Sequence, residues 1–436
     1  MKQYETYKDS GVEWIGEIPE HWAVRKLSYQ FNFNTGFTPS TGKNEFYENG
    51  EHIWVNISDL KEKFISDSKT KITDLAIEGK EIVPKGSLLY SFKLSVGKMA
   101  FATKEIYTNE AIFSIFPNKN INLNYYYFLL DRILIHNANE NIYGAKILNQ
   151  ELIKASKLVV PSPEEQTQIA NYLNHKTAQL DTLIAKKEQL INLLQEERTA
   201  MINQAVTKGL DPNVPMKDSG IEWLGEIPAH WMKTGLNKII KVKDGTHESP
   251  KAITKGDNTF PLITSKDFRN GKIIFKTAKH ISSEDHYNII KRSDSEKGDI
   301  IMSMIGGNIG NMVLIDTDKE FSIKNVCLFK TSGNEIIAKH LYYILKSSLL
   351  KIQIDLCSRG GAQGFLSLGD LRNLIYFVIP NSELKAIIKY LDEGTVKIDV
   401  IISKYQQEIE LLKEYKSALI SEVVTGKVDV REEVLN

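Results

Sequence analysis

The sequence predicts an α+β protein with two similar mixed α/β domains separated by two long helices that form an antiparallel coiled coil. Three observations support this prediction. The chain has 436 residues, which is too long for a single ordinary domain. A fifteen-residue segment occurs twice, and each half of the chain ends in a long apolar pattern with helical spacing. Together they predict an internal repeat with an approximate two-fold relation between its halves.

The repeat covers most of the chain. Residues 8–22 read KDSGVEWIGEIPEHW and residues 217–231 read KDSGIEWLGEIPAHW, with twelve of the fifteen positions identical. Further matches follow in the same order, including KGSLLYS from Lys85 with KGDIIMS from Lys297, and a Tyr-Tyr pair at 126 and again at 342. Because the matches continue along both halves, the second half repeats a whole module and not only one motif.

Each module begins with short apolar runs that we expect to be strands. Examples are 53–57, 88–92 and 300–304, which are bounded by Gly, Pro, Asn and Asp. The Lys-Gly pairs at 85–86 and 297–298 precede two of these runs and predict structural turns. We expect His21 and His230, at matching repeat positions, to be packed or hydrogen-bonded structural residues.

Each module ends with a predicted long helix. In the first, Ser162 is placed as the N-cap, Pro163 as the first helical residue and Glu165 where it can return the cap's hydrogen bond. Gly394 can divide the second helix into two pieces. The expected buried faces of the two helices consist of Ile169, Leu173, Leu180, Leu183, Ile184, Leu190, Ile191, Leu194, Met201 and Ala205, and of Ile387, Leu391, Ile398, Ile401, Ile402, Tyr405, Ile409, Leu412, Leu419 and Val423. Two such faces most simply bury each other; the alternative is that each helix packs on its own domain.

Charge is distributed unevenly although the net charge is zero. Residues 23–158 hold 17 basic and 14 acidic side chains, and residues 232–378 hold 22 and 15, so both globular segments are positive and the remainder is negative. Positive globular segments suit phosphate contact, whereas acidic helical regions suit protein partners.

Several chemistries have no sequence support. The chain contains no P-loop, no HExxH and only two cysteines, so we expect no ATP hydrolysis, no metal site and no catalytic residue in this chain. No apolar run is long enough to span a bilayer and the first ten residues are polar, which favours a cytoplasmic protein.

Specific motifs resemble the specificity subunit of type I restriction-modification systems over nearly the whole chain. They are the repeated GxEWxGEIPxHW signature, PSPEEQTQIANYL from Pro161 and VTKGLDP from Val206. The GFTPS string from Gly36, followed by WVNISDL from Trp54, resembles the opening of a target-recognition domain, and DGTH from Asp244 resembles an alternative opening. Leu384 departs from the pattern, because the first copy has Gln166 there, and we expect a weaker capping or partner contact.

This resemblance implies a non-catalytic, sequence-specific DNA-binding subunit with a role in host defence. Each target-recognition domain would read one half of a bipartite asymmetric site, and the helices would set the spacing and dock two DNA methyltransferase (modification) subunits. Restriction/translocase subunits would complete the complex. S-adenosylmethionine, ATP and Mg would bind the partner subunits, which would methylate adenine at N6 after flipping it out of the duplex. The alternative is a coiled-coil assembly protein whose two α/β domains bind proteins or ligands and have no DNA role.

The expected organisation and contacts follow from the motifs. The predicted segments are the N-terminal signature 1–22, the first target-recognition domain 23–160, the central helix 161–209, the repeated signature linker 210–231, the second target-recognition domain 232–379, the C-terminal helix 380–425 and the tail 426–436. The candidate DNA-binding residues have phosphate- or base-contacting side chains in loop-like places: Thr38, Ser40, Lys43, Asn56, Ser58, Lys93, Lys98 and Lys146 in the first domain, and Thr246, His247, Lys251, Ser265, Lys266, Arg269, Arg359 and Gln363 in the second.

Overall fold

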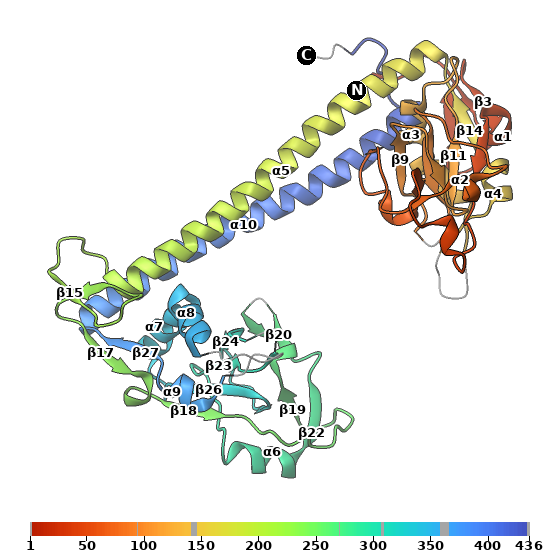
Figure 1. The fold of residues 1–436 in the computed structure, drawn as a ribbon. Helices are drawn as coiled ribbons and strands as arrows, with labels where there is room; N and C mark the ends of the chain where they lie inside the picture. The colour runs from red at the N-terminus through yellow and green to blue at the C-terminus, as the bar shows by residue number, and fades with distance from the viewer. Residues whose placement is uncertain are drawn as a thin grey trace. The chain divides into compact units, whose positions relative to one another are not determined.

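The computed structural model describes residues 2–93, 95–140, 146–269, 271–306, 309–357 and 366–433. Its internal contacts divide the chain into two units (Figure 1). One unit comprises residues 1–187 together with 407–436, and the other comprises residues 188–406. Each unit therefore contains one α/β domain and a part of both long helices. No helix in the described part of the chain is long and apolar enough to cross a membrane.

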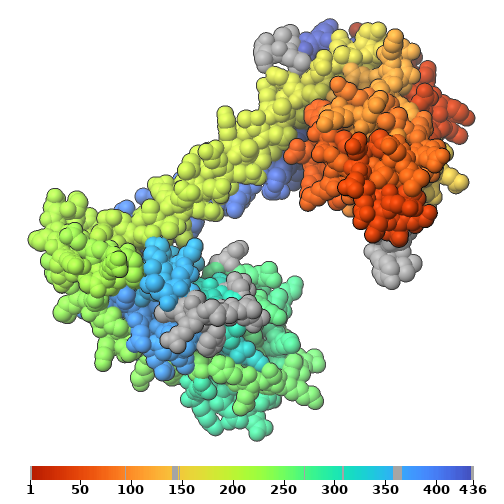
Figure 2. Space-filling view, in the orientation of Figure 1, coloured from red at the N-terminus to blue at the C-terminus, as the bar shows by residue number. Residues whose placement is uncertain are grey.

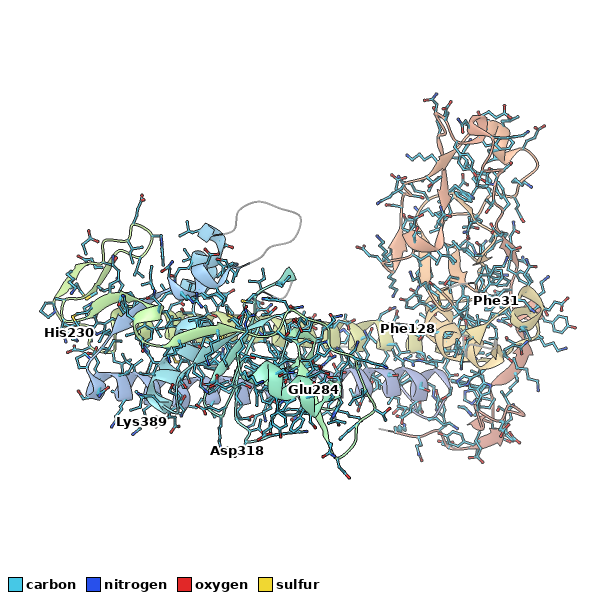
Figure 3. The ribbon with its side chains drawn as sticks, turned by 90° about the horizontal axis from the view of Figure 1, so that it is seen from below. Phe31, Phe128, His230, Glu284, Asp318 and Lys389 are labelled. Atoms are coloured by element: carbon cyan, nitrogen blue, oxygen red, sulfur yellow. The ribbon has the colours of Figure 1, made fainter. Side chains whose placement is uncertain are left out.

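The first domain is built on a five-stranded sheet with the order β4-β11-β8-β9-β6 and a three-stranded sheet with the order β10-β5-β7. Its strands are β1 Tyr7–Asp9, β2 Glu17–Pro19, β3 Ala23–Lys26, β4 Phe33–Thr35, β5 His52–Val55, β6 Phe64–Ile65, β7 Lys71–Ile72, β8 Leu88–Ser91, β9 Met99–Ala102, β10 Tyr107–Thr108, β11 Ile112–Ile115, β12 Asn139–Glu140, β13 Lys146–Ile147 and β14 Lys157–Val160. Its helices are α1 Leu27–Gln30, α2 Asp74–Ile77, α3 Leu123–Ile133 and α4 Gln150–Ala155, with 3-10 turns η1 Asn44–Phe46, η2 Ile57–Asp59 and η3 Leu134–Asn137. Phe31 and Phe128 belong to its main apolar core (Figure 3).

The second domain contains a four-stranded sheet with the order β18-β26-β23-β24 and a three-stranded sheet with the order β22-β19-β25. Its strands are β15 Met216–Asp218, β16 Glu226–Pro228, β17 Met232–Gly235, β18 Lys241–Asp244, β19 Thr259–Ile263, β20 Phe268–Arg269, β21 Lys272–Ile273, β22 Lys279–Ser282, β23 Ile300–Ser303, β24 Met312–Leu314, β25 Ser322–Ile323, β26 Val326–Lys330 and β27 Ile375–Val378. Its helices are α6 Ser283–Ile290, α7 Glu335–Lys346, α8 Ser348–Cys357 and α9 Leu368–Arg372, with 3-10 turns η4 Leu236–Lys238 and η5 Ser265–Asp267.

Most of the strand connectivity is shared by the two domains, although the edge strand β6 of the first has no counterpart in the four-stranded sheet of the second. In each larger sheet the antiparallel order β4-β11-β8-β9 corresponds to β18-β26-β23-β24. In each smaller sheet one pair is parallel, β5 with β10 and β19 with β25, and one pair is antiparallel, β5 with β7 and β19 with β22. The predicted fold class and internal repeat are therefore confirmed. The turn glycines Gly86 and Gly298 have φ angles of 87° and 88°, as the structural interpretation of the Lys-Gly pairs requires.

The two predicted long helices are present as α5 Pro163–Lys208 and α10 Asn381–Val424. Ser162 caps α5, because its hydroxyl oxygen accepts the N–H of Glu165 at 3.2 Å. The prediction that Glu165 returns the cap's hydrogen bond is wrong. Its carboxylate instead accepts a hydrogen bond from the Tyr4 hydroxyl at 2.7 Å and lies 3.0 Å from His21 Nε2. The helix end is thus joined to the N-terminal signature.

Ion pairs establish the antiparallel pairing within each unit. In the first unit Asp181 pairs with Lys416 at 2.6 Å, and Lys187 pairs with Glu408. Residue numbers therefore rise along α5 while they fall along α10. In the second unit α10 is continuous through Gly394, where a Cβ would lie 2.6 Å from Met201 Sδ. Gly394 allows close approach of the two helices and does not break α10.

The helices bury a narrower face than the sequence predicted. Both helix ends join the domain cores, for example Leu173 in the first unit and Leu391 in the second. Leu183, Leu190 and Ile401, which we expected to be buried, are exposed. The reason is that two paired helices cover only a narrow seam, so apolar residues beside the seam meet solvent. In Figure 2 the part of α5 that belongs to the first unit (yellow) is exposed on the face turned to the viewer.

The repeated signature is joined to each long helix by one carboxylate. His230 Nε2 lies 2.7 Å from Glu383, which also accepts the buried indole N–H of Trp231 at 3.0 Å. The structural interpretation of His21 and His230 is therefore confirmed. Leu384 is buried in the second core. Gln166, by contrast, donates to the Pro161 carbonyl and accepts the backbone N–H of residue 122, both at 3.0 Å. A polar contact in the first copy is replaced by apolar packing in the second.

Candidate nucleic-acid interface

A glycine at the same place in each domain lets the chain pass close to the end of a short strand, β10 in the first domain and β25 in the second. After β4, the N–H of Phe37 donates to the Thr108 carbonyl at 2.8 Å, and a Cβ on Gly36 would lie 1.9 Å from that oxygen. After β18, the N–H of residue 246 donates to the Ile323 carbonyl at 3.0 Å, and a Cβ on Gly245 would lie 2.5 Å from it. Only glycine tolerates either approach. The residues that follow are thereby placed beside corresponding strand ends, Thr38 beside the end of β10 and His247 beside the end of β25.

A capped 3-10 turn lies beside each crossing. In the first domain, Asn56 caps η2 and Asp59 returns the bond to the Asn56 N–H at 2.9 Å. In the second, Thr264 and Asp267 make the same reciprocal pair around η5. A further hydroxyl engages each aspartate, so both carboxylates are satisfied internally. The middle residues of the two turns, Ser58 and Lys266, are exposed.

A third segment completes the arrangement. The N–H of Asn109, after β10, donates to the Val55 carbonyl at 3.0 Å, and the N–H of Lys324, after β25, donates to the Ile263 carbonyl at 2.9 Å. We call the resulting set the rim of each domain. The first rim is Thr38, Asn56, Ser58, Asn109 and Glu110, and the second rim is His247, Thr264, Lys266, Lys324 and Asn325. The backbone is the same in both, whereas most side chains differ.

The first rim is mainly neutral and hydrogen-bonded. The Thr38 hydroxyl donates to the Glu110 carboxylate, and this bond lowers the pKa of Glu110 below its ordinary value. The side-chain amide of Asn109 donates to Asn56 Oδ1 at 3.4 Å. The structure thus brings together Thr38, Asn56 and Ser58 from the predicted set. Lys93 lies near enough to favour the charged form of Glu110.

The other predicted residues of the first domain are exposed but are not rim residues. Lys43 is 3.6 Å from Glu45 and stacks over Phe46. Ser40 belongs to the same loop. Lys98 and Lys146 are exposed, the latter on the β12-β13 hairpin. Their role in DNA binding stays a prediction.

The second domain contains a pocket of about 680 Å³ next to its rim. Its wall includes three predicted residues, Ser265, Lys266 and Arg269. It also includes Lys279, Lys324 and Asn325, which the sequence reasoning missed. Thr246 and Lys251 lie outside its wall, Thr246 accepting the N–H of residue 248 at 3.1 Å. Arg359 and Gln363 lie outside the described residues.

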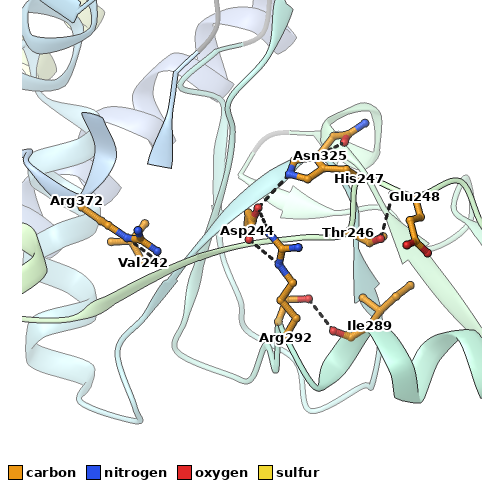
Figure 4. Close-up of polar contacts among 10 residues, drawn as sticks. Val242, Asp244, Thr246, His247, Glu248, Ile289, Arg292, Asn325 and Arg372 are labelled. Atoms are coloured by element: carbon orange, nitrogen blue, oxygen red, sulfur yellow. Dashed lines mark hydrogen bonds and ion pairs between the residues drawn. The ribbon is translucent and has the colours of Figure 1, made fainter. Parts of the chain in front are cut away.

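A buried carboxylate supports the second rim (Figure 4). Asp244 is joined to Arg292 by two hydrogen bonds, one of them 2.9 Å long, and its Oδ2 lies 3.0 Å from His247 Nε2. His247 Nδ1 lies 3.2 Å from Asn325 Oδ1. Burial favours the neutral form of Asp244, but the bonds from Arg292 and His247 outweigh it and lower its pKa. Asp244 therefore holds His247 in a fixed orientation at the rim.

Among the described residues no group of His, Cys, Asp and Glu side chains is arranged to hold a metal ion. The two rims instead offer hydroxyl, amide, carboxylate and cationic groups on exposed segments next to a rigid sheet. These are the groups that contact base edges and phosphates.

Comparison with known proteins places the chain among DNA specificity proteins. The family model described as the type I restriction modification DNA specificity domain matches residues 19–193 and again 228–411. The MjaIX specificity subunit of Methanocaldococcus jannaschii is 27% identical over 443 residues, covering 96% of this chain and 96% of the relative. The EcoBI specificity subunit of Escherichia coli is 24% identical over 313 residues, covering 70% and 65%.

Two solved structures share the fold. One, from work on complex assembly and conformational transition of the type I R-M system, has a TM-score of 0.66 at 14% identity and covers 94% of this chain and 99% of its own. The other, the HsdS subunit from Thermoanaerobacter tengcongensis, has a TM-score of 0.52 at 13% identity and covers 94% and 98%. At this identity the likeness concerns the fold alone.

Proposed function

The chain belongs to the family of type I restriction-modification DNA specificity subunits, and on this premise we propose that each of its two rims reads one half of a bipartite asymmetric DNA site. One observation carries the proposal: the two domains hold different side chains on the same backbone frame. Thr38 and Ser58 in one domain correspond to His247 and Lys266 in the other. Different side chains at equivalent places read different bases, so the two half-sites differ.

The chain is a non-catalytic component of the restriction-modification system. We propose that it acts with two adenine-N6 DNA methyltransferase subunits and with restriction/translocase subunits. S-adenosylmethionine, ATP and Mg would bind those partners. The complex would work in the cytoplasm, where its DNA substrate lies. The alternative of an assembly protein without a DNA role has no support among the relatives.

The paired helices are the proposed docking surface and spacer. In the second unit α5 exposes Leu190 and Leu193, and α10 exposes Val396 and Val400. Exposed apolar side chains on otherwise charged helices are a recurrent feature of protein interfaces. We propose that the methyltransferase subunits cover such residues and that helix length sets the gap between the half-sites.

Exchange of one domain tests the proposal. Residues 23–160 are replaced by the equivalent segment of a relative, the complex is assembled in a host, and methylated adenines are mapped across the genome. We expect one half-site to change while the other and the gap remain. The reciprocal exchange of residues 232–379 is the matched control, and it should change only the other half-site. A complex in which either exchange altered both half-sites would contradict independent reading.

A further inference from the structure

The two rims differ strongly in charge although their backbones correspond. Lys266 stands where the first domain has Ser58, and Lys324 stands where it has Asn109. Beside the rim, Lys279 pairs with Leu262 of β19. Thr70 holds the corresponding place in the first domain, where its carbonyl accepts the N–H of Trp54 in β5. Three neutral positions of the first domain are therefore lysines in the second. In the opposite direction, Glu110 of the first rim is replaced by the neutral Asn325.

The lysines of the second pocket are available to a ligand. Asp267, the acidic residue in the pocket wall, is occupied by bonds from Thr264 and from the Thr277 hydroxyl at 3.0 Å. Within the residues that the structure describes, no ion pair engages Lys266 or Lys279. Lys324 donates to a neutral acceptor, the hydroxyl of Ser249. The pocket therefore has donors and positive charge without a compensating free carboxylate.

The pocket wall is a candidate for a base contact. Its cations Lys266, Arg269, Lys279 and Lys324 come from four separate elements, η5, β20, β22 and the segment after β25, and they line one volume. Its apolar part includes Leu262 and Ile305. Phosphate contacts carry no sequence information, whereas base contacts do, so side chains that differ between two domains with the same frame are the candidates for base contacts. Guanine presents two adjacent acceptors, O6 and N7, and lysine or arginine donors are its commonest partners.

We propose that the second domain reads a guanine of its half-site through this pocket, with Lys266, Lys279 and Lys324 supplying donors to O6 and N7. The inference rests on the proposed DNA-reading function and specifies the chemistry of one half-site. At the corresponding places the first domain has the neutral side chains Ser58, Thr70 and Asn109, so no cation is available there for this contact. The two domains therefore impose different base requirements on the two half-sites.

The test uses the assembled complex and a duplex that contains its mapped site. In the test variant, three substitutions introduce the first domain's own residues: Lys266→Ser, Lys279→Thr and Lys324→Asn. The charge-matched control replaces three exposed lysines of the same domain that lie outside the pocket wall, Lys255, Lys276 and Lys291, by serine. Each guanine of the second half-site is replaced in turn by 7-deazaguanine, which lacks the N7 acceptor.

We expect one such replacement to weaken binding by the native complex and by the control about 5- to 150-fold. Binding by the test variant should be insensitive to that replacement. The variant should also accept other base pairs at this position, while its sequence preference at the first half-site stays the same. If the triple variant fails to assemble, Lys324→Asn alone is measured in the same way.

Two results would overturn the inference. One is specific binding that no 7-deazaguanine affects. The other is an equal loss of affinity for all DNA sequences, in which the slope of log binding constant against log salt concentration becomes smaller in magnitude by about three. That result indicates phosphate contacts only. Failure of the proposed function itself looks different, because the native complex would then show no sequence preference at all.

Discussion

His340 should make the second module sensitive to acid. This side chain on α7 is fully buried; its Nδ1 lies 2.8 Å from the Tyr376 hydroxyl, and its Nε2 has no hydrogen-bond partner. Burial lowers the pKa of His340 to about 3, whereas an unfolded histidine titrates near 6.5. The folded state thus keeps the imidazole neutral where the unfolded state binds a proton. The stability that His340 contributes is complete above about pH 6.5 and is lost as the pH falls towards 3.

The size of the effect follows from the pKa difference. Each pH unit between the two pKa values costs about 1.4 kcal/mol, so the free energy of unfolding should fall by roughly 2 kcal/mol from pH 7.5 to pH 5 on account of His340. The double variant His340→Leu, Tyr376→Phe removes the titrating group and its hydroxyl partner together, so no buried polar atom is left unpaired. Between pH 7.5 and pH 5 we expect the free energy of unfolding of the double variant to fall by about 2 kcal/mol less than that of the native protein.

Hydrogen exchange of α7 peptides, corrected for intrinsic rates, measures the effect in the full chain. His286 is also buried with a lowered pKa, chiefly through burial, so the native protein and the variant must be compared at each pH. Replacement of the exposed His247 by leucine is the control and should leave the pH dependence of α7 unchanged. Equal pH dependence in the native protein and the double variant would refute this account of His340.

Three further predictions concern backbone, helix end and spacer. Gly36→Ala should displace the crossing at β10 and abolish recognition of the first half-site in methylation mapping, whereas Gly42→Ala, with open space around its Cβ, should be neutral. Glu383→Ala should lower the free energy of unfolding by about 1–3 kcal/mol in urea titrations, because it leaves a buried indole N–H without an acceptor. Insertion of four residues after Ala185 in α5, matched by four after Glu410 in α10, adds about 6 Å of helix and should lengthen the gap between unchanged half-sites by one or two base pairs; an unchanged gap with retained methylation would show that the helices do not set it.

The long helices could be predicted because their signals are local. Ser162 and Pro163 start α5 where the sequence indicates, since a cap and an N1 proline act on their own turn. Burial along the helices was less predictable, because it depends on what lies beside them. Leu183 and Leu190 have the correct spacing for a buried face, but the two-helix seam leaves them exposed.

The candidate site was only partly predictable for the same reason. Lys324 and Asn325 follow a two-residue strand whose parallel pairing with β19 brings them to the rim, and nothing in their local sequence indicates that pairing. The corresponding residues Asn109 and Glu110, which follow β10, were missed for the same reason. Asp244 was likewise noted only as part of a motif. Its support of His247 depends on Arg292, which is distant in sequence.

The arrangement of each rim separates the residues that hold the backbone from those that can read DNA. Gly36, Asp59 and their counterparts Gly245 and Asp267 fix the crossing and the 3-10 turn through contacts within the domain. Ser58 and Lys266 lie on the same turns but are exposed, so exchanging them removes no core contact. Surface substitutions of this kind usually change stability by less than about 0.5 kcal/mol. A rim can therefore acquire a different base preference while its fold is kept, and a duplicated module with the same frame can carry two different half-site specificities in one chain.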